Sequence, residues 1–265
     1  MKIAVLGSHG FLGQYISRWL SVDHQVVQVT RDWIDLTELK QVTDWLRVAQ
    51  VNVIINCATA GVGCAKTEWV TSHLQNNVSV FLNFLNNQHH FDRFINIGSG
   101  AEYDRRYDIS FAQEHAVFDR TPQDSYGYSK NIISRLCCAH SKFHTLRVFG
   151  CFDASEAPYR FFKRISAGLE TILADRYFDF ISASDLCVVI NHYLSHDVDY
   201  RDINCVYLEK ERLWNIANKF IKQCGLPNKL KLESTGQVNY TGDGKKLEQL
   251  SLPLKGLTMS IKDYV

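Results

Sequence analysis

The feature that most constrains the fold is an alternation of short apolar runs with segments of helical spacing over the first 152 residues. Strands that are buried on both faces read as continuous apolar runs, and a helix between two such strands indicates a parallel β-α-β unit. The sequence therefore predicts an α/β fold with a doubly wound parallel sheet. The strand candidates are KIAVL (2–6), HQVVQVT (24–30), VNVIINCA (51–58), RFINIGS (93–99) and HTLRVFGCF (144–152). The helix candidates are residues 11–22, 36–49, 67–88 and 125–141.

The second part of the chain is less regular. After about residue 152 the alternation weakens, and the aromatic and charged segment APYRFFKRI (157–165) begins. We expect residues 1–152 to form the main domain and residues 153–265 to form mainly a smaller lobe. An apolar segment at about 178–196 is expected to return to the main domain, because its apolar residues need a surface on which to pack.

The composition is that of a globular chain, with 46% hydrophobic residues, 22% charged residues and a net charge of +1 over 265 residues. This length is sufficient for a large core. The near-neutral charge gives no argument for nucleic-acid binding, and no apolar stretch approaches the length of a membrane span. The apolar run at the N-terminus is too short for a signal peptide, so we expect a cytoplasmic protein.

The eight cysteines show no CxxC pair and no zinc-like grouping with histidine. Several lie in apolar runs, where a free cysteine behaves as a small buried hydrophobic residue. We predict that all are unpaired, that none is catalytic, and that the chain has no metal site. They are Cys57, Cys64, Cys137, Cys138, Cys151, Cys187, Cys205 and Cys224.

A glycine-rich segment, GSHGFLG, joins the first predicted strand to the first predicted helix, with glycines at positions 7, 10 and 13. Such a loop can bring the backbone close to a pyrophosphate, and the helix that follows offers unpaired N–H groups. The last glycine would let the helix pack tightly on the strand. A turn without a ligand is the alternative, but the strand-to-helix position favours a nucleotide-binding loop.

The segment SYGYSK (125–130) places Tyr126 four residues before Lys130. In a helix this spacing brings the phenol and the ammonium group to one face. Tyr128 has no lysine four residues later. A helical tyrosine is more often a packing residue and a lysine is usually solvated, so this pair needs support from the rest of the chain.

Taken together, these segments resemble the extended short-chain dehydrogenase/reductase family, in the branch that acts on nucleotide sugars. The resemblance covers nearly the whole chain and implies a Rossmann-type fold, with a dinucleotide-binding domain (1–152) and a substrate-binding lobe (mainly 153–265). The matching segments are GSHGFLG (7–13), INCAT (55–59), NNVSVFLNFL (76–85), NIGSGAEYD (96–104) and YGYSK (126–130), with LRVFGCF (146–152) and FDFISASDL (178–186) matching more loosely.

The resemblance implies a catalytic group of Ser99, Tyr126 and Lys130. Tyr126 would transfer the proton on the carbonyl or hydroxyl oxygen, and Ser99 would hydrogen-bond the same oxygen. Lys130 would lower the phenol pKa from its reference value of about 10 and hold the cofactor ribose. A serine that follows a strand is otherwise usually a turn residue.

The expected cofactor is NADP, with NAD as the alternative. After the second strand, Arg31 is a suitable partner for the 2′-phosphate of NADP, whereas Asp32 would suit the ribose of NAD. Asp35 matches family members that place an acid near the adenine. The cofactor-binding residues that the resemblance implies are Gly7, His9, Gly10, Phe11, Leu12, Gly13, Arg31, Asp35, Leu36, Cys57, Ala58, Thr59, Asn77, Tyr126, Lys130 and Phe149.

Departures from the family narrow the expected reaction. Sugar-nucleotide dehydratases carry an acidic pair directly after the catalytic serine or threonine, where this chain has Gly100 and Ala101, with Glu102 one position late. Members that epimerise carbons 3 and 5 use a cysteine where Ala101 stands. We therefore expect a 4-ketoreductase of a 4-keto-6-deoxy nucleotide sugar. A 4-epimerase with tightly bound NAD and a non-catalytic dinucleotide-binding protein remain as alternatives.

The substrate contacts are the least defined part of the resemblance. Phe178 stands where many members have an arginine that binds the nucleotide. Ser99 is expected at the reacting oxygen, and Arg160, Lys163 and Arg176 are candidates for the diphosphate of the nucleotide sugar. The family also allows for a homodimer.

Overall fold

The structure is a computed structural model that describes residues 1–62, 68–233 and 238–264. Its centre is a six-stranded sheet in the order β10-β6-β4-β3-β1-β2, in which every neighbouring pair is parallel. This confirms the predicted α/β fold with a doubly wound parallel sheet. The six strands are β1 (Lys2–Leu6), β2 (Gln25–Val29), β3 (Val53–Asn56), β4 (Arg93–Ser99), β6 (Phe143–Val148) and β10 (Asp202–Asn204).

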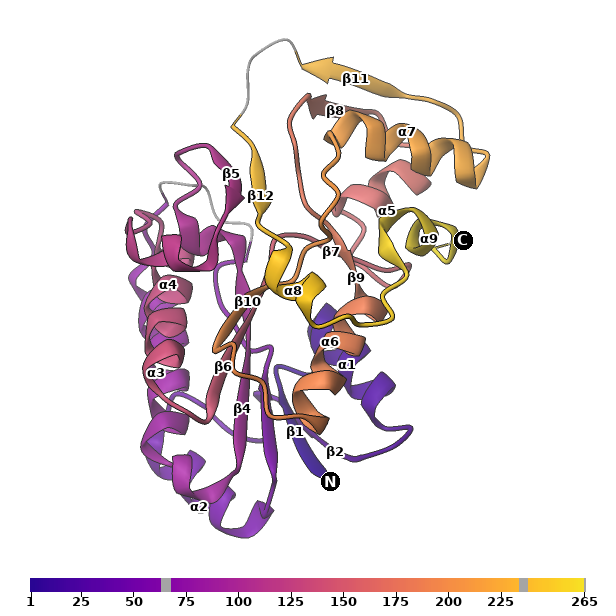
Figure 1. Ribbon diagram of the computed structural model, residues 1–265. Coiled ribbons are helices and arrows are strands. Elements are labelled where there is room, and N and C mark those ends of the chain that lie inside the picture. The colour runs from indigo at the N-terminus through magenta and orange to yellow at the C-terminus, as the bar shows by residue number, and fades with distance from the viewer. Residues whose placement is uncertain (63–67, 234–237, 265) are drawn as a thin grey trace.

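Helices cover both faces of this sheet (Figure 1). Successive residues of a strand point to opposite faces, and along β1 Ile3 and Val5 belong to one hydrophobic cluster whereas Ala4 and Leu6 belong to the other. This burial on both faces explains the continuous apolar runs of the sequence. The first cluster is closed by α1 (Phe11–Leu20) and α6 (Ala183–Ser195), the second by α2 (Leu39–Ala49), α3 (Thr71–Asn86) and α4 (Ser125–Ala139).

The strand order places a crevice at one end of the sheet. From β1 the chain moves outward to β2 and then crosses to β3 on the other side, so the loops that follow β1 and β3 diverge. In open parallel sheets, ligands bind at this topological switch point, outside the carboxyl ends of the strands. The N-terminus lies at the opposite end of the sheet (Figure 1).

A second lobe lies above the carboxyl ends of the strands (Figure 1). It has its own aromatic cluster, which includes Phe152, Phe162, Phe220 and Tyr264. The cluster lies between short helices and the two-stranded sheet β11-β8. The elements of this lobe are α5 (Phe161–Ser166), β8 (Thr171–Ala174), α7 (Leu213–Cys224), β11 (Leu230–Glu233) and α9 (Gly256–Lys262).

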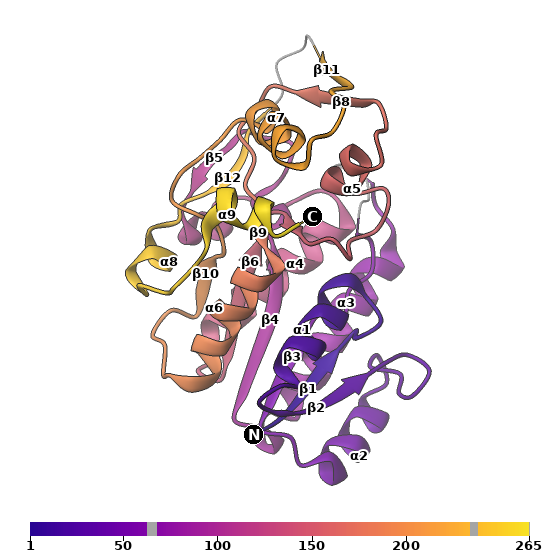
Figure 2. The same cartoon turned by 90° about the vertical axis from the view of Figure 1, so that its right-hand side faces the viewer.

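The chain crosses between the two parts several times after residue 152. Residues of α6 join the cluster of the central sheet, and β10 extends that sheet beside β6. Strand β10 was not predicted from the sequence, and the division at residue 152 stays a prediction. Two short parallel pairs lie where the parts meet (Figure 2), namely β7 (Cys151–Phe152) with β9 (Ile181–Ser182) and β5 (Ile109–Ala112) with β12 (Tyr240–Gly242). The remaining elements are η1 (Gln88–His90), η2 (Gly100–Tyr103), η3 (Glu114–Phe118) and α8 (Lys245–Gln249).

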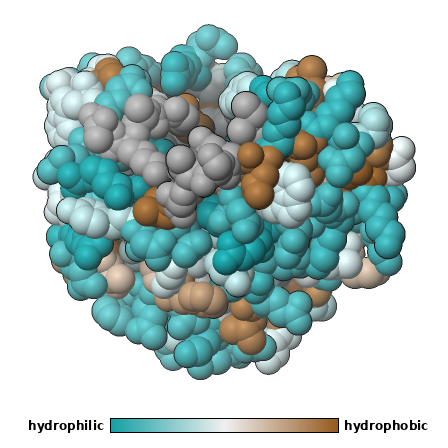
Figure 3. Space-filling view, turned by 90° about the horizontal axis from the view of Figure 1, so that it is seen from above, coloured by the Kyte–Doolittle hydropathy of each residue, from teal (hydrophilic) through white to brown (hydrophobic). Residues whose placement is uncertain are grey.

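The face of the molecule seen from above is mostly hydrophilic, with hydrophobic residues in small groups (Figure 3). Within the described part of the chain, no helix is both long enough and apolar enough to span a membrane.

Candidate active site

A cavity of about 1200 Å³ opens at the carboxyl ends of the central strands. One wall is made by the loops after β1, β2 and β3, and another by the end of β4 and the first two turns of α4. The second lobe closes it with Ala157, Tyr159, Arg160, Arg176, Phe178 and residues 238–240. The volume exceeds the roughly 300–1,000 Å³ of a pocket for one small ligand.

The glycine loop forms the floor of this cavity. Gly7 has a φ of +70°, and a Cβ atom on it would lie 2.7 Å from the Cα of Ala58. A Cβ on Gly13 would lie 2.3 Å from the carbonyl oxygen of Gly7. Only glycine therefore allows this turn to lie against both the loop after β3 and helix α1. Gly10 is the N-cap of α1 and no side chain caps the helix, so N–H groups of its first turn are available to an anion. This cradle fits the pyrophosphate of a dinucleotide.

The end of β2 forms the outer rim of the cavity. Arg31, Asp32 and Asp35 all line it. The Asp35 carboxylate accepts hydrogen bonds from the N–H and the hydroxyl of Thr37, at 2.9 and 2.7 Å, and these bonds lower the pKa of Asp35. Arg31 is exposed and makes no ion pair with any residue that the structure describes. The guanidinium group is therefore open to a ligand at this rim.

Asn77 of α3 connects the loop after β3 to α4. Its Oδ1 accepts from the N–H of Ala60 at 2.7 Å, and its Nδ2 donates to the carbonyl of Ala60 and to the hydroxyl of Ser129. Asn77 is buried, so these bonds satisfy its amide in a region without solvent. It also lines the cavity, so the same side chain lies beside the space that a ligand would fill.

The three expected catalytic residues line the same part of the cavity. Ser99 ends β4, whereas Tyr126 and Lys130 lie on successive turns of α4. Gly127 lets the start of helix α4 lie close to η2, which directly follows β4, because a Cβ on it would lie 2.8 Å from the carbonyl oxygen of Ala101. The N-cap Asp124 accepts from the N–H of Gly127 at 2.6 Å and fixes the first turn.

The pKa of Tyr126 is raised above its usual value of 10.0. Burial raises the pKa of Tyr126, while a hydrogen bond with Ser99 and the charge of Arg105 lower it less strongly. Burial also lowers the pKa of Lys130, whose ammonium donates to the carbonyl of Ile97 at 2.9 Å. Desolvation is thus the largest effect on the phenol, and the expectation that Lys130 lowers its pKa stays a prediction.

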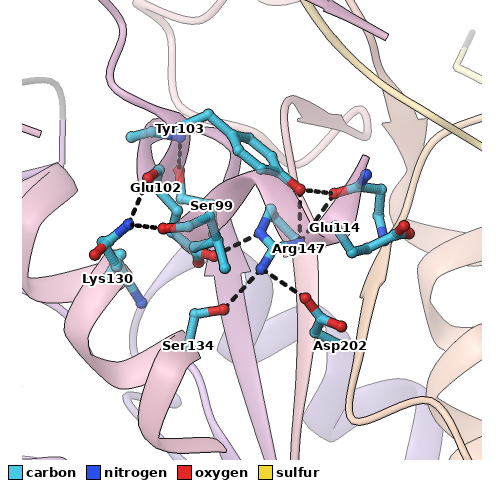
Figure 4. A network of polar contacts seen from close by, with 12 residues as sticks. Ser99, Glu102, Tyr103, Glu114, Lys130, Ser134, Arg147 and Asp202 are labelled. Carbon is cyan, nitrogen blue, oxygen red and sulfur yellow. Dashed lines mark hydrogen bonds and ion pairs between the residues drawn. The ribbon is translucent and has the colours of Figure 1, made fainter. Parts of the chain in front are cut away.

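Behind Ser99 lies a buried ionic network (Figure 4). The Glu102 carboxylate accepts the N–H of Ser99 at 2.8 Å through Oε1 and binds Nε of Arg147 at 2.5 Å through Oε2. The guanidinium of Arg147 also donates to Tyr103, Ser134 and Asp202. Glu102 and Arg147 are both 0% exposed. Glu102 thus faces away from the cavity and holds the backbone of the serine.

The candidates for substrate binding separate into two groups. Arg160 and Arg176 line the cavity, although Arg160 also binds Glu156 and the carbonyl of Cys151. Lys163 does not line it and instead donates to the carbonyl of Ala154 at 2.7 Å. The structure therefore brings two of the three cations to the cavity.

All the other residues expected from the sequence to bind cofactor or substrate line the cavity. Several polar residues of the same wall were not predicted from the sequence, because they lie in irregular segments without a motif. These are Arg105, Tyr159, Asn239 and Tyr240.

The cysteines that the structure describes are all free, and Cys64 lies outside the described residues. Cys57 lines the cavity, but burial raises the pKa of its thiol to about 12. A neutral thiol is a poor nucleophile. No group of three or more potential metal ligands occurs among the described residues.

The fold and the glycine cradle define a dinucleotide-binding α/β protein with a second lobe over the cavity. Residues 3–205 match the model of the NAD dependent epimerase/dehydratase family, and the chain belongs to that family. This confirms the resemblance inferred from the sequence. A comparison with curated proteins found no significant match.

Proteins of similar fold whose structures have been solved are named for different reactions. A dTDP-4-dehydrorhamnose reductase from Bacillus anthracis, solved with NADP, has a TM-score of 0.82 at 17% identity, covering 99% of this chain and 96% of that one. A dTDP-glucose 4,6-dehydratase from the same organism, solved with NAD, has a TM-score of 0.81 at 13% identity, covering 100% and 95%. A GDP-mannoheptose C4 reductase from Campylobacter jejuni, solved with NADP, has a TM-score of 0.77 at 17% identity, covering 99% and 97%. Overall structural similarity therefore does not distinguish a reductase from a dehydratase. That distinction depends on individual residues of the site.

Proposed function

We propose that this protein is an NADPH-dependent reductase of a 4-keto nucleotide sugar. The single observation that carries the proposal is the meeting of Ser99, Tyr126 and Lys130 in the cavity that also contains the glycine cradle. In this proposal Tyr126 gives a proton to the carbonyl oxygen while the nicotinamide cofactor supplies the hydride. Ser99 hydrogen-bonds the same oxygen, where negative charge develops during the transfer.

The raised pKa of Tyr126 fits the role of a proton donor. A ketone becomes an alcohol only if the acid still holds its proton when the hydride arrives. A phenol whose pKa lies at or above 10.0 is protonated at neutral pH. An oxidation, by contrast, would need the phenolate first.

The positions of the carboxylates argue against a dehydratase. Glu102 is paired with Arg147 and buried behind Ser99. Among the described residues that line the cavity, the only carboxylates are Asp32 and Asp35, at the rim beside β2. A dehydratase needs an acid and a base next to the sugar, which this wall does not offer within the described residues.

The cofactor assignment rests on Arg31 and on the structural relatives solved with NADP. The glycine loop, Asn77, Lys130 and the end of β2 would hold the dinucleotide, and Arg31 would bind the 2′-phosphate. The other half of the cavity, with Arg160 and Arg176, is left for the nucleotide sugar. A cytoplasmic location and a homodimer also remain predictions.

The proposal is tested by NADPH oxidation with a panel of 4-keto-6-deoxy sugar nucleotides that differ in base and sugar. We expect at least one member to be reduced, with loss of absorbance at the reduced nicotinamide band. If a 4-hydroxy nucleotide sugar is instead interconverted with its epimer without added cofactor, the protein is a 4-epimerase. If neither occurs although NADPH binds, the non-catalytic alternative holds.

Arg31→Ala is expected to weaken NADPH binding about ten- to a hundredfold while leaving NADH binding nearly unchanged. A charge-assisted hydrogen bond contributes about 1.5–3 kcal/mol, and only NADPH carries the phosphate. Titration of both cofactors by fluorescence or calorimetry measures the difference. Arg47→Ala is the matched control, because Arg47 is exposed on α2 and does not line the cavity. An equal loss for both cofactors would remove Arg31 from the phosphate site.

A further inference from the structure

Tyr240 brings a second phenol to the reaction site from the far end of the chain. It is the first residue of β12 and lines the cavity together with Ser99 and Tyr126. The Ser99 side chain lowers the pKa of both Tyr126 and Tyr240 by hydrogen bonding, against the larger effect of burial. Three hydroxyl groups from β4, α4 and β12 therefore meet at one place.

The backbone of Tyr240 is held on both sides. Its N–H donates to the carbonyl of Tyr177 at 3.0 Å, and its carbonyl accepts from the N–H of Asp179 at 3.1 Å. The Asp179 carboxylate accepts from the N–H of Gly242 and binds Lys210, both at 2.8 Å. The side chains of Asp179 and Lys210 are only 6% and 4% exposed, so this ion pair is buried. β12 is thus a fixed support for the phenol.

The ring of Tyr240 also has a defined place. It packs against Phe149 and Phe178, with ring centroids 5.0 and 5.2 Å away. These contacts would suit a phenylalanine equally well, so they do not account for the hydroxyl group. Burial and the neighbouring Tyr126 raise the pKa of Tyr240, which keeps it protonated and able to donate a hydrogen bond at neutral pH.

We propose that the Tyr240 hydroxyl contacts the sugar ring of the substrate beside Ser99 and Tyr126, and donates a hydrogen bond to an oxygen at its reacting edge. This inference rests on the proposed function and adds a substrate-contacting residue from the second lobe. The sugar would then be held between a hydroxyl of the lobe and the catalytic pair of the main domain. A sugar ring that is slightly misplaced reacts much more slowly, so such a contact affects turnover as well as binding.

Tyr240→Phe tests the contact, because it removes one oxygen and keeps the ring. We expect kcat/KM for the keto-sugar nucleotide to fall about ten- to a hundredfold, between the effect of a neutral hydrogen bond and that of a donor to a developing oxyanion. NADPH affinity should not change. Tyr177→Phe is the matched control, because its ring lies against Arg212 and outside the cavity wall. If the two variants have equal kcat/KM, Tyr240 is only a packing residue.

A binding measurement separates this inference from the proposed reaction. In a Tyr126→Phe background, calorimetry compares UDP-glucose, dTDP-glucose and GDP-mannose with the free nucleoside diphosphates. Adding Tyr240→Phe should weaken the binding of the sugar nucleotide that binds best. The affinity for the corresponding free nucleoside diphosphate should not change. Unchanged affinity for that sugar nucleotide overturns the Tyr240 contact, even in a protein that reduces keto sugars. If no nucleotide sugar binds to any variant, both the contact and the proposed substrate class are overturned.

Discussion

Tyr126→Phe is expected to reduce kcat by about 10² to 10⁴, the usual contribution of a positioned general acid. The substitution removes the hydroxyl that lies beside Ser99 and keeps the aromatic ring in the first turn of α4. The glycine cradle and Lys130 are untouched, so the dissociation constant for NADPH should stay within about twofold, well below the tenfold change that 1.4 kcal/mol would produce. Single-turnover kinetics and a cofactor titration separate the two effects.

The adjacent Tyr128 supplies the matched control for this experiment. It lies on the same helix but packs against Trp69, with ring centroids 5.8 Å apart, and does not line the cavity. Tyr128→Phe should therefore keep nearly full activity. A Tyr126→Phe protein as active as Tyr128→Phe would refute the role of Tyr126 as proton donor.

Arg147→Met is expected to lower the free energy of unfolding by about 3–5 kcal/mol, because it leaves the buried Glu102 without its cation. The same change removes the donor to Asp202 in β10, so the edge of the central sheet should loosen as well. Urea unfolding, followed by circular dichroism, measures the loss. The glutamate also holds the N–H of Ser99, so the variant should lose kcat even where it remains folded.

An exposed ion pair gives the comparison for Arg147→Met. Lys231 and Glu170 approach to 2.7 Å, with side chains 64% and 55% exposed. Exposed pairs contribute little, so Glu170→Gln should change stability far less than Arg147→Met. If both variants lost a similar amount of unfolding free energy, the buried network would contribute no more to stability than an exposed ion pair.

The fold was best predicted for segments whose own residues reveal how they are buried. Strands β1 and β4 are covered on both faces, so their apolar runs were readable as strands of a parallel sheet. The turn after β1 was equally readable, because contacts of the backbone itself require Gly7 and Gly13. The family resemblance then predicted which residues would line one cavity.

Features that depend on distant partners were not predictable. β10 has the sequence DIN, and its Asp202 is buried because Arg147, far away in the chain, neutralises it. Tyr240 lies in a polar stretch, and its position depends on backbone bonds to residues 177 and 179. The effect of burial on the phenol pKa of Tyr126 was not predictable, because helical spacing gives the neighbour Lys130 but not the degree of burial.

In the proposed reaction, hydride passes from NADPH to carbon 4 of a nucleotide sugar. The most direct test uses NADPH carrying deuterium at the transferable position, with mass spectrometry and NMR of the product. We expect one deuterium per product molecule, at carbon 4, and the consumption of one equivalent of NADPH. A product that is formed without deuterium would contradict it, because the hydride would then have come from the substrate itself through a bound cofactor.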